Sequence, residues 1–317
     1  MLRYLLRRIP SAILVLFGAS VLIFAVIRLV PGDPATTLAG VDATPQAIAA
    51  IRHHLGLDQP LLQQYLGWLH GLITGNLGTS YMIGGQISDL LANGAVNTII
   101  LAAAALVLAV AISLITACVW VWSRNRVIDS VLTGFNTVTL GLPTFVTGVL
   151  LVLIFGILLP ILPPGGVPPK GFADRVDISA QYLVMPAVCL ALPASAALTR
   201  FLAESLRTEL RSPYVTTARA AGIGERRLLL AHALPAALPT YITALGIHVG
   251  GLLGGAVLVE AVFTWPGLGQ LLSQSIDSRD YPVVQILLLI SVGLFIVIQL
   301  ITDAIHAVLD PRVRVGS

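Results

Sequence analysis

The sequence predicts an all-α, polytopic membrane protein with six transmembrane helices. Of its 317 residues, 56% are hydrophobic and only 10% are charged, whereas a soluble domain carries about 25% charged residues. The mean hydropathy is +0.92. Apolar runs long enough to cross a hydrocarbon core of about 30 Å cover residues 10–30, 98–122, 131–159, 182–201, 239–262 and 283–308.

The first apolar run predicts a transmembrane helix and the orientation of the chain. It is too long for a signal peptide, and no small-residue cleavage site follows it. Arg3, Arg7 and Arg8 precede it, which places the N-terminus in the cytoplasm. With six spans the C-terminus is cytoplasmic too, and the cytoplasmic loops then hold most of the arginines. The net charge of +3 therefore reflects membrane topology, and we expect no nucleic acid as a partner.

After the cytoplasmic N-terminus and first span (residues 1–30), residues 31–93 form the largest extracytoplasmic segment. A Thr-Pro pair at 44–45 can start a short helix, and apolar residues between 61 and 73 follow a helical stripe. Aromatic residues in this second helix suit a position on the outer membrane interface. The segment is either a helical cap on the outer ends of the spans or a surface that contacts substrate.

The other five spans belong to a transmembrane core, residues 94–309, which a cytoplasmic tail, residues 310–317, follows. Few ionisable groups lie near the membrane in this core. Glu260 stands near the outer end of the fifth span and Asp303 near the inner end of the sixth. An unpaired charge in hydrocarbon costs several kcal/mol, so each lines a translocation pathway or gate, or is a paired structural residue. Two aromatic residues of the outer loop, Phe263 and Trp265, are candidates for the same pathway.

One long charged stretch, residues 204–235, interrupts the core on its cytoplasmic side. Ser212 can cap a helix there. Gly222 and Gly224 stand where the end of a helix wants residues that tolerate positive φ, and a second helix restarts at Glu225. Small side chains before the glycines leave a face shallow enough to seat in a groove of another protein. The alternative is an ordinary basic loop.

The chain lacks the motifs of several enzyme classes, and we predict neither catalytic residues nor a metal site. A phosphate-binding P-loop needs a Gly-Lys-Ser/Thr step, but the single lysine, Lys170, lies between Pro169 and Gly171. His-Glu-x-x-His and Gly-x-Ser-x-Gly strings are absent as well. Cys118 and Cys189 lie in different spans, where they suit packing. If ATP drives this protein, a different polypeptide hydrolyses it.

The charged stretch resembles the coupling loop of ABC importer permeases. That pattern reads Glu-Ala-Ala, three residues, Gly, nine residues, Ile-x-Leu-Pro. Matching residues are Ala218, Gly222, Leu234 and Pro235, and departing ones are Thr216, Thr217 and His232. The resemblance implies that this loop docks on a cytoplasmic ATPase. The residues expected to make that contact are Tyr214, Thr217, Ala218, Arg219, Ala220, Gly222, Ile223, Gly224, Leu234 and Pro235.

Further strings resemble the dipeptide, oligopeptide and nickel branch of this family, in the subunit with the long N-terminal extracytoplasmic segment. They include Pro31-Gly32-Asp33-Pro34, Leu77-Gly78-Thr79-Ser80, Arg279-Asp280-Tyr281-Pro282 and Asp310-Pro311-Arg312. His306 stands where that family usually has Tyr. The resemblance covers nearly the whole chain.

The resemblance implies a type I importer permease fold in the bacterial cytoplasmic membrane. It also implies a second homologous permease, two ABC ATPase domains, an extracytoplasmic binding protein and surrounding lipid as partners. No cofactor is expected on this chain, because ATP and Mg²⁺ would bind the ATPase subunits. The cargo is open among dipeptides, oligopeptides, haem and nickel complexes.

Two other classes remain for comparison. A secondary transporter or channel favours inverted repeats and several intramembrane charges, and an intramembrane enzyme needs a nucleophile or metal motif. The sequence offers little of either, so an ATP-driven permease subunit is the leading hypothesis.

Overall fold

The computed structural model describes residues 2–30, 32–40, 42–123, 125–168 and 176–309. Within these ranges the elements are helices, and the one strand-like pairing is an isolated antiparallel bridge between Thr79 and Gln86. The all-α prediction is confirmed. The chain folds into two compact units, residues 1–97 with 266–300 and residues 98–265 with 301–317.

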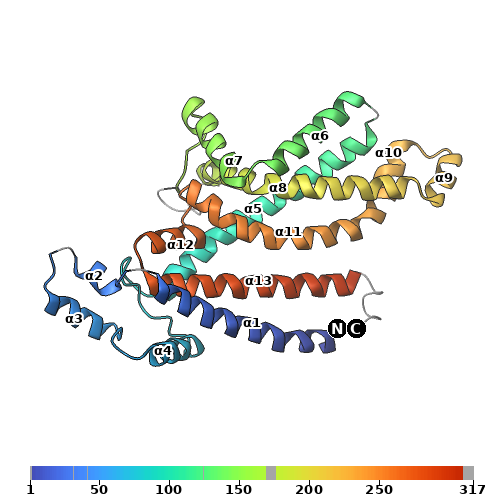
Figure 1. Cartoon of the computed structure of the whole chain (residues 1–317). Helices are drawn as coiled ribbons and strands as arrows, with labels where there is room; N and C mark the ends of the chain where they lie inside the picture. The colour runs from blue at the N-terminus through green and yellow to red at the C-terminus, as the bar shows by residue number, and fades with distance from the viewer. Residues whose placement is uncertain (1, 31, 41, 124, 169–175, 310–317) are drawn as a thin grey trace. The chain divides into compact units, whose positions relative to one another are not determined.

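In the first unit the long helix α1 (Leu2–Leu29) runs beside residues 281–300 of α13 (Tyr281–Leu309) (Figure 1). Three short helices follow α1, and these are α2 (Pro34–Ala39), α3 (Pro45–His54) and α4 (Leu61–Thr74). Helices α3 and α4 confirm the two predicted helices, and α2 was not predicted. Thr44 caps α3 as its sequence predicts, because its hydroxyl accepts a hydrogen bond from the Ala47 amide at 3.3 Å. Helix α12 (Leu268–Asp277) lies in the predicted outer loop before α13.

A buried carboxylate joins the loop before α5 (Ile87–Trp122) to the turn before α13. Asp280 is fully buried and accepts hydrogen bonds from the amides of Tyr81 and Met82 at 3.1 and 3.0 Å. The hydroxyl of Ser80 donates to the same carboxylate. These partners satisfy the buried charge. Asp280 therefore connects the string that ends at Ser80 to its own string, residues 279–282, and both strings resemble the permease family.

The second unit contains the rest of α5 and the helices α6 (Arg126–Gly141), α7 (Thr144–Leu151), α8 (Val176–Leu210) and α11 (Leu234–Val262), with the π-helix η1 (Val152–Leu158) after α7. Helices α8 and α11 lie side by side (Figure 1). Their facing side chains are mostly small or aliphatic, so the two helices pack closely. Buried residues of this core include Leu101, Ala105, Met185, Leu190, Ala194, Leu252, Ala256 and Val259.

The span predicted over residues 131–159 is sharply bent. The structure has two helical segments there, Arg126–Gly141 and Thr144–Leu158, bent by 107°. Pro143 explains the break, because proline lacks an amide hydrogen and disfavours helical geometry in the residue before it. Leu142 accordingly has the extended angles φ −85° and ψ 127°.

Five other helices in the described part of the chain are long and apolar enough to cross a membrane, and the bent pair brings the number to six if it counts as one span. Helix α8 is unbroken although Pro186 and Pro193 lie within it. The tail, residues 310–317, lies outside the described residues.

Candidate functional site

The charged interruption forms the predicted helix, turn and helix. Helix α9 (Pro213–Ala220) follows the end of α8. After a turn, α10 (Glu225–Arg227) leads through the π-helix η2 (Leu228–Ala233) into α11 without a break. The restart at Glu225 is confirmed.

Gly222 ends α9 in a left-handed conformation, with φ +83°. The Gly222 amide donates to the carbonyl of Arg219 at 3.0 Å, and the Ile223 amide donates to the carbonyl of Ala218 at 3.2 Å. These two bonds form a Schellman motif, which satisfies carbonyls that the helix end would otherwise leave without donors. The glycine of the coupling pattern is therefore required by backbone geometry, because a side chain disfavours this φ.

The expectation that Gly224 also needs positive φ is wrong. Its φ is −67° and its ψ is 149°, ordinary extended angles at the N-cap of α10. A Cβ built on Gly224 meets no atom within 4 Å. Any residue can adopt this backbone, so the two glycines have different structural roles.

An ion pair bridges the turn between α9 and α10. Arg219 donates from Nε to Glu225 Oε1 at 2.7 Å and from Nη2 to Oε2 at 3.2 Å. This bidentate geometry orients both groups. The hydrogen bond that Arg219 donates to Glu225 raises the pKa of Arg219, and the negative charge of Glu225 raises it further. Glu225 is also the first residue of α10, where a negative charge favours the helix dipole.

The entry to α9 differs from the predicted cap. Ser212 occupies the N-cap position, but its hydroxyl donates to the carbonyl of Glu209 at 2.6 Å instead of capping the helix. Tyr214 donates its hydroxyl to the Glu209 carboxylate at 2.9 Å. Desolvation and then this hydrogen bond raise the pKa of Tyr214. Glu209, the penultimate residue of α8, thus connects α8 to α9.

Buried apolar side chains anchor this exposed unit. Val215 on α9 and Leu228 on η2 are fully buried. Leu229 belongs to a cluster with residues of α8 and α11, which includes Leu198, Leu202, Leu206, Ala237 and Tyr241. The exposed members of the predicted contact set are Tyr214, Thr217, Arg219, Ala220, Gly222, Gly224 and Pro235, while Ala218, Ile223 and Leu234 are half-buried. The loop therefore presents a polar, small-residue surface on an apolar base.

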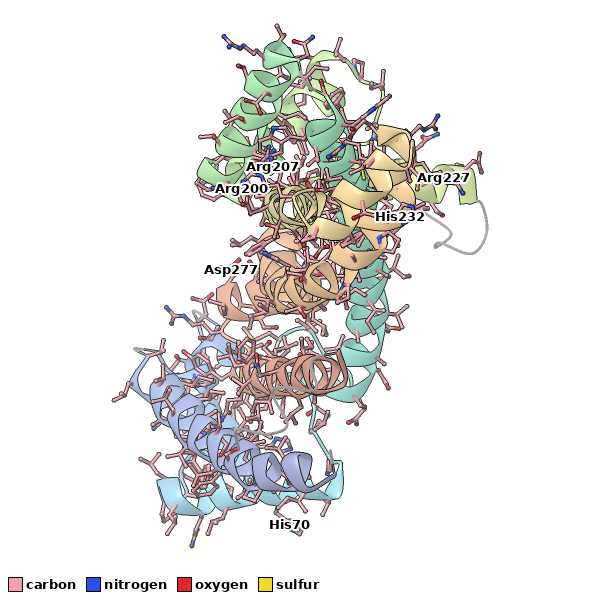
Figure 2. The ribbon with its side chains drawn as sticks, turned by 90° about the vertical axis from the view of Figure 1, so that its right-hand side faces the viewer. His70, Arg200, Arg207, Arg227, His232 and Asp277 are labelled. Carbon is pink, nitrogen blue, oxygen red and sulfur yellow. The ribbon has the colours of Figure 1, made fainter. Side chains whose placement is uncertain are left out.

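Leu234 and Pro235, the last two residues of the coupling-loop pattern, directly follow η2. The amide of Leu234 donates to the carbonyl of Leu229, five residues earlier. Pro235 has no amide to donate, and in a regular α-helix its ring would collide with the carbonyl four residues earlier. The wider π-helical turn relieves that collision, so the helix passes Pro235 unbroken. Figure 2 labels Arg227 and His232 on this α10–η2 segment.

Three of the four candidate gate residues are buried in the second unit. Glu260 is fully buried and accepts a hydrogen bond from the Thr98 hydroxyl at 2.7 Å. Phe263 and Trp265 have 1% and 0% of their surfaces exposed and belong to the hydrophobic core. A lining role for these three needs a conformation that exposes them. Asp303 lies on α13, but its side chain is outside the described part of the chain.

The sequence reasoning missed a cavity of about 650 Å³ in the second unit, lined by residues of α5, α6 and α8. Asn136 lies 3% exposed in its wall; its amide donates to the Leu132 carbonyl at 2.8 Å, and its Oδ1 has no partner. Arg200 and Arg207 lie on the same side of α8 (Figure 2). The polar residues of α6 in this cavity recur at helical spacing, at positions 133, 136 and 137, a signal that the sequence already contained.

The described residues contain no group of three or more His, Cys, Asp or Glu side chains that could hold a metal ion.

Two family profiles match the chain. The binding-protein-dependent transport system inner membrane component matches residues 109–315, and the N-terminal part of the membrane component of such systems matches residues 1–86. The glutathione transport system permease protein GsiC of Escherichia coli K12 is 36% identical over 317 residues, which cover 99% of both chains. The protein of the same name from Salmonella choleraesuis is 37% identical over the same length.

Two solved structures share the fold. A crystal structure of an amino acid ABC transporter with histidines has a TM-score of 0.54 and 18% identity, covering 69% of this chain and 94% of that one. An inward-facing structure of the MetNI methionine ABC transporter has a TM-score of 0.54 and 20% identity, covering 70% and 96%. The fold is that of type I ABC importer permeases.

Proposed function

Because this chain belongs to the family of binding-protein-dependent transport system inner membrane components, we propose that its exposed segment from Tyr214 to Pro235 couples transport to ATP hydrolysis on separate subunits. The chain is a multi-span permease subunit of an ABC importer, and ATP is hydrolysed by partner subunits. The identity and number of those partners belong to the proposal: a second similar permease, two cytoplasmic ATPase domains and an extracytoplasmic binding protein.

The observation that carries the proposal is the construction of the α9–α10 unit. A Schellman turn and a bidentate ion pair hold its exposed face, while buried Val215 and Leu228 attach it to the helices behind. A rigid element that is exposed on one face and packed on the other can transmit a displacement to α8 and α11. An ordinary basic loop would need none of these features.

In the proposed mechanism, ATP closes the ATPase pair, and this movement displaces the α9–α10 unit together with α8 and α11. ATP can favour the outward-facing state only if the loop makes different contacts in the two states. Hydrolysis then restores the first arrangement. Both termini of this chain are placed in the cytoplasm in this scheme, in agreement with its arginine distribution.

We propose small peptides as the cargo. The relatives in Escherichia coli and Salmonella are named for glutathione transport, and the α5–α6–α8 cavity offers groups that suit the backbone and carboxylate of a peptide. They are the Asn136 amide and the guanidinium groups of Arg200 and Arg207. A binding assay of di- and oligopeptides on the cognate extracytoplasmic binding protein tests the cargo class separately from the coupling.

Co-purification of the ATPase with variants of the loop tests the coupling role. We expect the wild-type permease to retain an ATPase and to take up cargo in liposomes only with it and ATP. Arg219→Glu should release the ATPase, because it replaces the ion pair with two like charges. The matched control is Arg126→Glu at the exposed start of α6, which should retain it.

Two results would contradict the proposal. One is uptake by the permease alone in liposomes, which would make it a secondary transporter. The other is an ATPase that stays bound and fully coupled to Arg219→Glu.

A further inference from the structure

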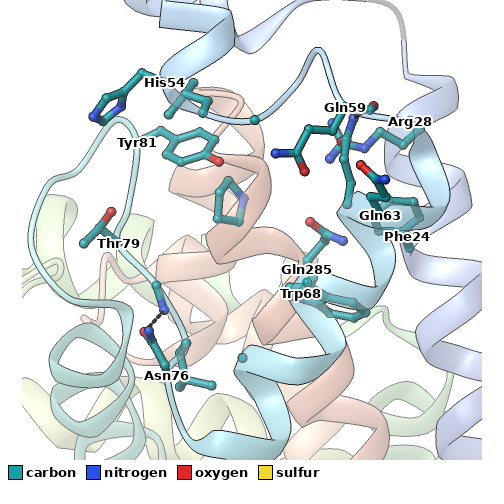
Figure 3. Close-up of a pocket in the computed structure, with 18 residues that line it drawn as sticks. Phe24, Arg28, His54, Gln59, Gln63, Trp68, Asn76, Thr79, Tyr81 and Gln285 are labelled. Atoms are coloured by element: carbon teal, nitrogen blue, oxygen red, sulfur yellow. Dashed lines mark hydrogen bonds between the residues drawn. The ribbon is translucent and has the colours of Figure 1, made fainter.

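The first unit contains a cavity of about 470 Å³, separate from the cavity of the second unit. It lies among the last turn of α1, helix α4, the loop at 76–81 and the first turns of α13 (Figure 3). These segments come from three separate parts of the sequence, and no single motif marks the cavity.

Unpartnered polar atoms concentrate in the wall of this cavity. In the described part of the chain, six buried side-chain nitrogen or oxygen atoms have no hydrogen-bond partner, and four of them belong to residues that line it. Those four are Arg28 Nε, Gln64 Oε1, Trp68 Nε1 and Gln285 Nε2. Gln285 is only 6% exposed. Buried polar groups are normally satisfied, so this grouping suits a ligand that carries complementary polar atoms.

The chemistry of the four atoms selects an anion. Three of them are N–H donors, and Arg28 also carries a permanent positive charge. None of the 18 residues that line the cavity is Asp or Glu, and no ion pair of Arg28 occurs among the described residues. Its guanidinium packs 5.1 Å from the ring centroid of Phe24. A cavity wall that offers N–H donors and a positive charge, and no carboxylate, is complementary to an oxyanion.

The position of the cavity indicates which oxyanion. Arg28 is in the last turn of the apolar span Ile9–Leu29, where a helix of that length would leave the hydrocarbon core. Helix α4 beside it exposes large apolar side chains, which are Leu61, Leu62, Leu66 and Ile73. Such a helix suits the boundary between lipid headgroups and acyl chains, where a guanidinium group can donate to a headgroup phosphate.

We propose that this cavity binds a phosphate group, with a phospholipid headgroup as the source that its surroundings favour. Arg28, Trp68 and Gln285 donate to the phosphate oxygens, and Gln64 Oε1 accepts from a hydroxyl of the headgroup. The volume exceeds that of one phosphate and leaves room for a glycerol unit. The bound headgroup would fasten α4 and the end of α1 to the membrane surface.

Native mass spectrometry of the purified full complex, titrated with phosphatidylglycerol, measures how tightly the complex retains this lipid. A hydrogen bond to a charged group corresponds to about a tenfold or greater change in affinity, so Arg28→Gln, Trp68→Phe and Gln285→Leu should each weaken retention of the lipid by about that factor. Arg28→Lys keeps the charge but loses the Nε donor and should lie between wild type and Arg28→Gln. The matched control is Arg52→Gln on α3, which pairs with Asp33 outside the cavity and should not change retention.

A second arm uses inorganic phosphate and thermal unfolding to identify the source. If phosphatidylglycerol binding falls in the cavity variants but not in the control, the phosphate belongs to a lipid. If inorganic phosphate stabilises wild type but not Arg28→Gln, while lipid retention is equal in both, the site takes a soluble phosphate. Trp68→Phe preserves the ring and reports on the site even if Arg28→Gln fails to fold. Equal binding of both probes by wild type and Trp68→Phe would overturn the proposal and leave a cavity filled by water only.

Discussion

Arg219 and Glu225 form a bidentate ion pair across the turn at Gly222, with hydrogen bonds of 2.7 and 3.2 Å. Their side chains are 45% and 47% exposed, and ion pairs this exposed add little to the free energy of unfolding. The contribution of the pair is geometric instead. Together with the Schellman bonds it holds α9 and α10 in one arrangement, which is what a docking element requires.

Exchanging the charges of Arg219 and Glu225 tests whether the pair acts by holding the loop in shape or by presenting a charge to the ATPase. Glu225→Arg alone should lower cargo-stimulated ATPase activity of the reconstituted complex, because two positive charges then face each other across the turn. The double variant Arg219→Glu with Glu225→Arg should recover most of that activity. All variants should melt near the wild-type temperature. Failure of the double variant to recover would mean that the ATPase contacts Arg219 directly.

Gly222 and Gly224 make a matched pair for testing the backbone requirement. Gly222→Val should destabilise the loop by about 1–2 kcal/mol, the usual cost of a left-handed residue with a Cβ, and should reduce coupled ATPase activity. Gly224→Ala should leave both unchanged, because its φ is −67°. Gly222→Asn should be milder than valine, since Asn tolerates this conformation. Equal effects of Gly222→Val and Gly224→Ala would contradict the assignment.

The carboxylate of Asp280 should control the order of the loop before α5. Asp280→Asn removes the charge to which Ser80 and the amides of Tyr81 and Met82 donate, and imperfectly paired buried donors cost about 1–3 kcal/mol. We expect faster hydrogen exchange of these amides in Asp280→Asn. Ser80→Ala should show a smaller increase, because both amides keep their acceptor. Unchanged exchange in Asp280→Asn would show that other contacts hold this loop.

His53 and Asp58 predict a local response to pH in the segment after α3. Nδ1 of His53 lies 2.6 Å from Oδ2 of Asp58. The hydrogen bond between them raises the pKa of His53 and lowers the pKa of Asp58. The attraction is present in full below the ordinary histidine value of 6.5 and is lost as pH rises through the raised pKa. In acid, the attraction between the two side chains is present in full above the ordinary aspartate pKa of 3.8. It disappears as the pH falls through the lowered pKa of Asp58.

Titration of isotope-labelled histidine by NMR in nanodiscs measures this effect. We expect Asp58→Asn to bring the pKa of His53 back toward 6.5. The assignment can be checked with His53→Gln, which removes the affected resonance. An identical His53 titration in wild type and Asp58→Asn would show that the pair does not form in the membrane.

Glu260 offers a test between a gate and a structural residue. Its carboxylate is buried and accepts from Thr98, so Glu260→Ala should lower the melting temperature; a polar group left without its partner costs about 1–3 kcal/mol. Thr98→Val removes the same bond without touching the carboxylate and serves as the control. If Glu260 is also a gate, uptake per folded complex should fall in Glu260→Ala but not in Thr98→Val. Normal uptake and coupled ATPase activity in both would reject the gate.

By itself the sequence determined the membrane class, the approximate spans, the helices of the N-terminal segment and the helix-turn-helix around Gly222. These depend on composition, periodicity and end signals, which act over a few neighbouring residues. The sequence also marked Gly222 correctly, but it could not distinguish Gly224, because two glycines in one turn look alike until their backbone angles are known.

Only the tertiary structure decided the rest. It showed the size of the bend in the predicted third span, 107°, the burial of Glu260, Phe263 and Trp265, and the contact of Ser80 with Asp280, 200 positions apart. It also brought Arg28, Trp68 and Gln285 into one cavity. Such features depend on which distant segments share a volume, and hydrophobic burial, which drives that choice, is proportional to area and carries no direction.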